Sequence, residues 1–130
     1  MNTIDKKGLK GITALLVHAA KIDEIYSEHE KTLIKDFVKS YLTDENPSTI
    51  LKEAEEIEKN SNQLLSFTSV VKQNSIEVKK DILKHLWKVI ISDNTVDQYE
   101  SNLMRRICGL IYVPDKISAE IKLQLLNEKK

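Results

Sequence analysis

The sequence predicts an all-α protein, a single-domain bundle of about seven helices with an internal two-fold helix-elbow-helix repeat. The 130 residues include only 3 glycines and 2 prolines, so turns are few. Apolar residues recur at steps of three and four, which is the spacing of one helical face. An acidic elbow occurs twice, 70 residues apart, which indicates two copies of one unit. It comprises Asp23, Ser27 and Glu30 in the first copy and Asp93, Asp97 and Glu100 in the second.

Composition places the chain among globular proteins with one core, and we expect residues 1–130 to form one domain. Lys plus Arg equals Asp plus Glu at 20 each, so no overall charge favours nucleic acid. No apolar run approaches the roughly 20 residues of a membrane span, and the N-terminus lacks an apolar signal stretch. We therefore expect no membrane insertion and a cytoplasmic protein. The one cysteine, Cys108, excludes an intramolecular disulfide.

The first repeat, about residues 9–42, predicts two helices. One is expected over about 5–22, with Leu9, Ile12 and Leu16 on its apolar face. The next begins after Ser27, because Ser27 and Glu30 have the spacing of a capping box. It should end near residue 42, because Pro47 disfavours a helical conformation at Asn46 and a break is expected there.

Two helices are expected between the repeats. The first, over about 48–60, should bury an apolar stripe and expose a solvated acidic face. The stripe is Ile50, Leu51, Ala54 and Ile57, and the acidic face is Glu53, Glu55, Glu56 and Glu58. The second is short, over about 64–73, and its β-branched residues weaken the helical pattern.

The second repeat, about residues 79–112, also predicts two helices. The one over 76–92 has apolar residues over a wide arc, so we expect it to be the central and most buried helix. The other runs from Gln98 to about residue 112 and ends before Pro114. A last helix places Ile117, Ile121 and Leu125 at steps of four.

One interpretation of the elbow carboxylates is purely structural. Ser27 and Asp97 are then N-caps, and Glu30 and Glu100 are their box partners. The two remaining acids lie where helices end, where the helix dipole disfavours a negative charge by about 0.3–1 kcal/mol. In this interpretation Asp23 and Asp93 bond the elbow amides in Asx turns.

The second interpretation is that the carboxylates of the two elbows converge on a divalent cation. The candidate ligands are Asp23, Glu30, Asp93 and Glu100, with Ser27, Asp97 and Glu24 nearby. Such hard oxygen donors suit Ca²⁺, Mg²⁺ or Mn²⁺. An EF-hand is excluded, because its loop needs Gly at position 6 and Glu at position 12. Counting from Asp23 places Glu28 at position 6 and Ile34 at position 12. Counting from Asp93 places Gln98 and Met104 there, so neither copy fits.

Other chemistry is weakly indicated. The three histidines show no zinc-ligand spacing, and Cys108, opposite Val38 in the repeat, should be a small buried hydrophobe. Arg105 and Arg106 could bind an anion or a partner, although such pairs are more often solvated. There is no glycine-rich phosphate loop, no catalytic-triad pattern and no aromatic-basic surface for RNA. We therefore expect no enzyme and no nucleic-acid partner. A metal-dependent enzyme that uses the elbow carboxylates is a further alternative, but it would need a cleft with a perturbed acid or base, which no sequence feature demands.

The two elbows and the residues around them resemble the tellurite-resistance protein B (TerB) family. The resemblance rests on His18-Ala-Ala-Lys-Ile-Asp23 with Ser27 and Glu30, and on Leu86-Trp87 through Asp93, Asp97 and Glu100. It covers nearly the whole chain. The N-terminal domain of the membrane-anchored co-chaperone DjlA is similar. The family's glycine after each elbow aspartate is Glu24 in the first copy and Asn94 in the second.

The resemblance implies a small, cytoplasmic, non-enzymatic helical module linked to tellurite resistance and stress responses. It also implies a metal site at Asp23, Glu30, Asp93 and Glu100, which Glu24 could extend. We expect a protein partner to use the acidic elbow face. The alternative is a metal-free interaction domain, or one that recruits a co-chaperone, in which the elbow carboxylates only cap helices.

Overall fold

The computed structural model describes residues 6–21, 26–42, 46–61, 65–91 and 98–128, without the side chains of residues 6, 7, 65, 66 and 98–100. Seven helices and no strand form within these ranges, as the sequence predicts. The helices are α1 (Lys6–Ala20), α2 (Glu28–Tyr41), α3 (Pro47–Lys59), α4 (Leu65–Lys72), α5 (Ile76–Ile91), α6 (Gln98–Leu110) and α7 (Asp115–Glu128).

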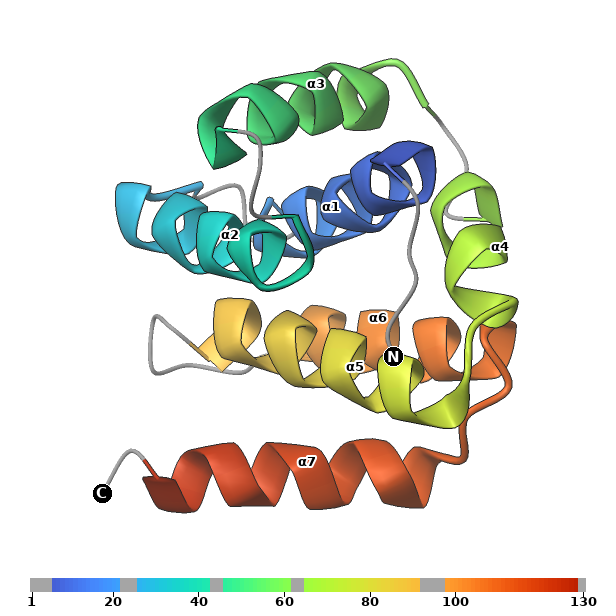
Figure 1. Ribbon diagram of the computed structural model, residues 1–130. Coiled ribbons are helices and arrows are strands. Elements are labelled where there is room, and N and C mark those ends of the chain that lie inside the picture. The colour runs from blue at the N-terminus through green and yellow to red at the C-terminus, as the bar shows by residue number, and fades with distance from the viewer. Residues whose placement is uncertain (1–5, 22–25, 43–45, 62–64, 92–97, 129–130) are drawn as a thin grey trace.

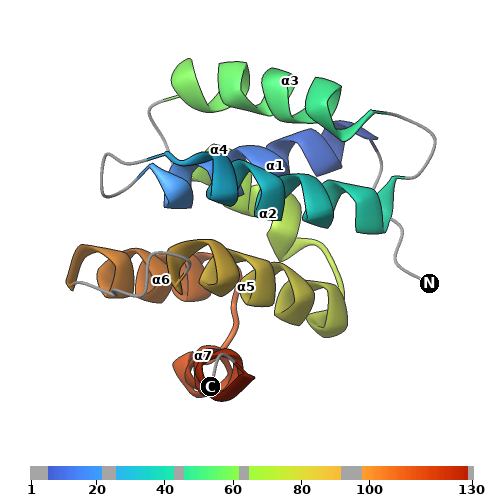
Figure 2. The same cartoon turned by 90° about the vertical axis from the view of Figure 1, so that its left-hand side faces the viewer.

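The helices stack in layers (Figure 1). α3 lies outermost on one side, α1 and α2 form the next layer, α5 and α6 follow, and α7 lies outermost on the other side. Figure 2 shows the same order after a quarter turn, with α7 seen nearly end-on. α4 packs against both α1 and α6, and so joins the two inner layers at one edge. The two outer helices each cover one inner layer.

The helix boundaries reproduce the repeat. α5 begins 70 residues after α1 (Ile76 against Lys6), and α6 begins 70 residues after α2 (Gln98 against Glu28). The outer helices follow the same plan, because α3 packs on α1 and α7 packs on α5. Three apolar pairs matched by the offset are buried, namely Ile34 with Met104, Phe37 with Ile107, and Val38 with Cys108.

Local signals fix several helix ends. Asn46 caps α3 by accepting a 2.9 Å hydrogen bond from the Ser48 amide, and Pro47 occupies the first helical position. Two residues after the end of α6, Tyr112 has a left-handed backbone with φ of 59°. The Val113 amide there bonds the Cys108 carbonyl at 3.0 Å, which is the long bond of a Schellman cap. A glycine would be usual at this position, and tyrosine is uncommon.

The central helix is α1, so the expectation that the 76–92 helix is the most buried was wrong. α1 packs against α2, α3, α4 and α5, and every side chain from Ile12 to Val17 is 0 % exposed. Thr13 lies in this stretch and satisfies its hydroxyl by donating a 2.7 Å bond to the Leu9 carbonyl. α5 packs on α1, α2 and α7, and its polar residues keep one face accessible.

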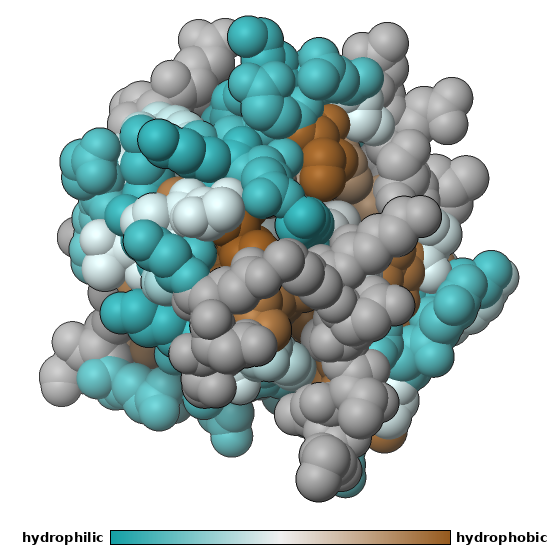
Figure 3. Space-filling model, turned by 45° about the horizontal axis from the view of Figure 1, so that its top comes forward, coloured by the Kyte–Doolittle hydropathy of each residue, from teal (hydrophilic) through white to brown (hydrophobic). Residues whose placement is uncertain are grey.

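The orientation of α3 also differs from expectation. Ile50, Leu51 and Ala54 are buried as predicted, but Ile57 is 38 % exposed. Three of the four glutamates expected to be solvated instead face the neighbouring helices. Glu53 pairs with Lys10, Glu55 accepts from Tyr26, and Glu58 pairs with Lys21. The outward side carries residues such as Lys52, Glu56 and Lys59, and Figure 3 shows the α3 side of the molecule as mainly hydrophilic.

Candidate functional site

The first elbow leads into α2 through a complete capping box, as the sequence predicts. The Ser27 hydroxyl accepts from the Glu30 amide at 3.1 Å, and the Glu30 carboxylate accepts from the Ser27 amide at 2.9 Å. Glu30 is only 6 % exposed, although it is a carboxylate. The box therefore holds an acidic group at the buried start of α2, where the helix dipole favours negative charge.

A tyrosine links this elbow to α3. The Tyr26 hydroxyl donates a 2.7 Å hydrogen bond to Glu55 Oε2, and the Lys31 ammonium lies 5.0 Å from the Tyr26 ring centre. Burial raises the pKa of Tyr26 well above its usual value, and the nearby carboxylates of Glu55, Glu30 and Glu28 raise it further. The phenol therefore stays protonated and donates from the segment that precedes α2 to Glu55 on α3.

The second elbow leads into α6. Because α6 begins at Gln98, Glu100 is its third residue, just as Glu30 is the third residue of α2. Asp23, Glu24, Asp93 and Asp97 lie outside the described residues, and so does the side chain of Glu100. Within the described part of the chain no three His, Cys, Asp or Glu side chains gather as metal ligands would. The four-carboxylate site therefore stays a prediction.

The helix ends that flank the elbows lie toward the same side of the molecule. In Figure 1 the last turns of α1 and α5 and the first turns of α2 and α6 form the left-hand ends of these helices. Glu30 and Glu100 belong to those first turns.

A second polar cluster joins α2 to α5, and sequence reasoning did not identify it. The Tyr41 hydroxyl donates a 2.6 Å hydrogen bond to Asp81 Oδ2, and His85 Nε2 lies 3.6 Å from Asp81 Oδ1. Phe37 contacts both the Tyr41 and the His85 rings, with centroid distances of 5.0 Å. The four-residue step from Asp81 to His85 was a usable signal, but nothing local indicated Tyr41.

Burial dominates the electrostatics of this second cluster. It lowers the pKa of His85, although the Asp81 carboxylate acts in the opposite direction, and it raises the pKa of Tyr41 together with the bond to Asp81. His85 was expected to be a hydrogen-bonded boundary residue, and its side chain is 14 % exposed. The cluster is therefore a contact between α2 and α5, in which Asp81 binds Tyr41 and lies near His85.

A third cluster joins α1 to α3. Glu58 accepts from Lys21 Nζ at 2.8 Å and lies 3.1 Å from His18 Nδ1. Partial burial alone would raise the pKa of Glu58, but the bonds to Lys21 and His18 lower it below its usual value. His18 is thus a hydrogen-bonded boundary residue, as expected.

Cys108 is a small buried residue on α6, as expected from its alignment with Val38. It is 1 % exposed, and burial raises the pKa of its thiol. A neutral buried thiol is a poor nucleophile, which agrees with the structural role predicted from the sequence.

The model of one protein family, described as tellurite resistance protein TerB, matches residues 10–123. The match includes both elbows and all but the last five residues of α7. The chain belongs to the TerB family. No curated protein and no solved structure gives a significant match. Across the described residues of this TerB-family chain, no helix is both long and apolar enough to span a bilayer.

Proposed function

We propose that this TerB-family chain is a non-enzymatic binding module linked to tellurite resistance and stress responses, and that its two elbows bind a divalent cation. The observation that carries the proposal is the equivalent placement of two glutamates. Glu30 and Glu100 are each the third residue of helices that start 70 residues apart and lie toward one side of the molecule.

The ligands in this proposal are Asp23, Glu30, Asp93 and Glu100. Four carboxylates close together repel one another, and a divalent cation removes that repulsion. The Glu30 carboxylate is already oriented by the Ser27 amide, so it would meet a cation with little loss of side-chain entropy. Oxygen donors of this kind select Ca²⁺, Mg²⁺ or Mn²⁺ over softer metals.

We propose a non-enzymatic module because the described groups whose pKa values are displaced have structural roles. Tyr41 and Glu58 have displaced pKa values and are hydrogen-bonded between helices, and Tyr26, which precedes α2, is hydrogen-bonded to Glu55 on α3. Cys108 also has a displaced pKa and lines a pocket between α5, α6 and α7, but burial raises the pKa of its thiol, which makes it a poor nucleophile.

A second candidate function is a metal-free interaction domain, including one that recruits a co-chaperone. The completed capping box favours it, because Ser27 and Glu30 already satisfy each other without any ligand. In this case the elbow acids stabilise helix starts, and a protein partner binds the acidic elbow face.

Thermal unfolding of metal-stripped protein separates the two functions. We expect millimolar Ca²⁺, Mg²⁺ or Mn²⁺ to raise the melting temperature, and Asp23→Ala combined with Asp93→Ala to abolish the rise while helix content is retained. If the double variant loses helicity and stability and the wild-type protein does not respond to any cation, the carboxylates are caps only. The search would then turn to protein partners.

A further inference from the structure

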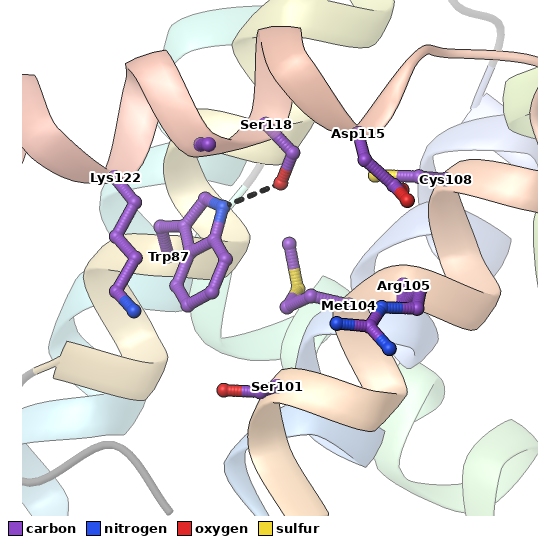
Figure 4. Close-up of a pocket in the computed structure, with 9 residues that line it drawn as sticks. Trp87, Ser101, Met104, Arg105, Cys108, Asp115, Ser118 and Lys122 are labelled. Atoms are coloured by element: carbon purple, nitrogen blue, oxygen red, sulfur yellow. Dashed lines mark hydrogen bonds between the residues drawn. The ribbon is translucent and has the colours of Figure 1, made fainter. Parts of the chain in front are cut away.

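A pocket of about 210 Å³ opens between α5, α6 and α7, and none of the four proposed cation ligands lines it. Figure 4 shows its lining side chains. They combine apolar groups, two cations, one carboxylate and two hydroxyls, and the residues that matter are Trp87, Met104, Arg105, Asp115, Ser118 and Lys122. The pocket lies within the described part of the chain.

The pocket floor is apolar and fixed. Trp87 is 4 % exposed, and its indole N–H donates a 2.9 Å hydrogen bond to the Ser118 hydroxyl on α7. This bond satisfies the one polar atom of the indole and sets the direction of the ring. Met104 lies beside it and is 1 % exposed. Both side chains expose only a small area to the pocket, so an apolar group that enters it touches this area without displacing the hydrogen bond to Ser118.

The pocket rim is cationic. The Lys122 ammonium lies 5.2 Å from the Trp87 ring centre, and Figure 4 shows the Arg105 guanidinium beside Met104. Two cations face one carboxylate, that of Asp115, so the lining carries a net positive charge. Among the described residues, neither Arg105 nor Lys122 forms an ion pair with a carboxylate. Both therefore remain available to an anion.

At the described positions that the repeat matches to this pocket, the first half of the chain has a different lining. The residues that precede Trp87, Met104 and Cys108 by 70 positions are Val17, Ile34 and Val38. All three are 0 % exposed and aliphatic. The aromatic floor therefore belongs to the second half and is not a consequence of the repeated helix plan.

We propose that this pocket binds a small aromatic carboxylate. The ring packs against Trp87 and Met104, and the carboxylate lies between Arg105 and Lys122. The volume favours a single ring, because pockets for drug-sized ligands hold about 300–1,000 Å³. A carboxylate is favoured over a point anion because guanidinium groups bind it through two parallel hydrogen bonds. The apolar floor supplies the affinity that a small inorganic anion would lack.

The single tryptophan of the chain makes the pocket directly observable, because Trp87 gives the only indole N–H signal in a ¹H–¹⁵N spectrum. The probes are benzoate, its neutral counterpart benzamide, and acetate, which has the charge without the ring. We expect benzoate to shift the Trp87 signal saturably in the millimolar range, and benzamide and acetate to bind about tenfold more weakly.

Three variants test the role of the rim. Arg105→Gln and Lys122→Gln should each weaken benzoate binding about fivefold to tenfold. Arg106→Gln is the matched control, because Arg106 is exposed on the same helix and does not line the pocket. Dispersed spectra of all variants confirm that they fold. The proposal is overturned if benzoate causes no saturable shift, if benzamide binds as tightly as benzoate, or if Arg106→Gln weakens binding as much as Arg105→Gln.

Discussion

The Tyr41 hydroxyl donates a 2.6 Å hydrogen bond to Asp81 across 40 residues of sequence, and this bond joins α2 to α5. It connects the first copy of the repeat to the second. Removing the hydroxyl by Tyr41→Phe leaves a partly buried carboxylate without its donor. We expect a loss of about 1–2 kcal/mol in the free energy of unfolding, measured by urea denaturation.

The control for this change is Tyr112→Phe. Tyr112 is 69 % exposed, so loss of its hydroxyl should change stability by no more than about 0.5 kcal/mol. Equal stabilities of Tyr41→Phe and the wild-type protein would show that the bond to Asp81 does not hold the two helices together.

Acid should destabilise the protein through His85. Burial holds the pKa of His85 in the folded protein below its value in an unfolded chain, so below about pH 6.5 the unfolded state binds more protons. The stability that neutral His85 contributes is present above that pH and is lost as the pH falls through the lower, folded pKa. The groups around it are Asp81 and Asp36, which favour protonation, and Lys88 and Lys84, which oppose it.

The measurement is the free energy of unfolding at about pH 7.5 and about pH 5.5. Between these two pH values, the His85→Gln variant should lose less stability than the wild-type protein does. His29→Gln, at an exposed position at the start of α2, serves as the control. A steeper acid loss in His85→Gln than in the wild-type protein would contradict the direction of the pKa shift.

Glycine inside a helix costs conformational entropy that alanine avoids. A Cβ built at Gly109 on α6 has no atom within 4 Å, and one at Gly11 on α1 lies 3.5 Å from Val70 Cγ2, an ordinary contact. Gly109→Ala and Gly11→Ala should each raise the free energy of unfolding by about 0.5–1 kcal/mol in urea denaturation. If Gly11→Ala destabilises the protein and Gly109→Ala does not, then α1 and α4 pack more closely than the 3.5 Å contact indicates.

Local sequence signals predicted the features that residues close in sequence determine, such as helix caps and helix boundaries. The capping box at Ser27 and Glu30 and the stop before Pro47 act within one helical turn, and the structure has both. The boundaries of α5 and α6 followed from the same period and turn signals. Burial of Cys108 followed from its match with Val38 in the repeat.

The remaining features depend on tertiary packing, which a single sequence does not contain. The expectation for α5 rested on its wide apolar arc, yet four helices cover α1, so the central helix was misidentified. On α3, Ile57 continued the apolar pattern, but Lys21 and His18 pair with Glu58 and turn that side inward. The Trp87 pocket also needed α7, whose weak pattern gave no indication that Ser118 would meet the indole.

The central claim, that the elbows bind a divalent cation, can be tested at Glu30 without disturbing the helix cap. Glutamine at this position keeps an oxygen that accepts from the Ser27 amide, but it removes the charge that a cation needs. Ser27→Ala does the reverse, because it removes the hydroxyl half of the box and leaves the carboxylate. That change should cost about 1 kcal/mol of stability.

The decisive measurement is isothermal titration calorimetry of the metal-stripped protein with Ca²⁺, Mg²⁺ and Mn²⁺. We predict that at least one cation binds the wild-type protein and Ser27→Ala, and that Glu30→Gln weakens this binding by about tenfold or more. Absence of binding by all three cations, or binding that Glu30→Gln leaves unchanged, would contradict the proposal and leave the elbow carboxylates as helix caps.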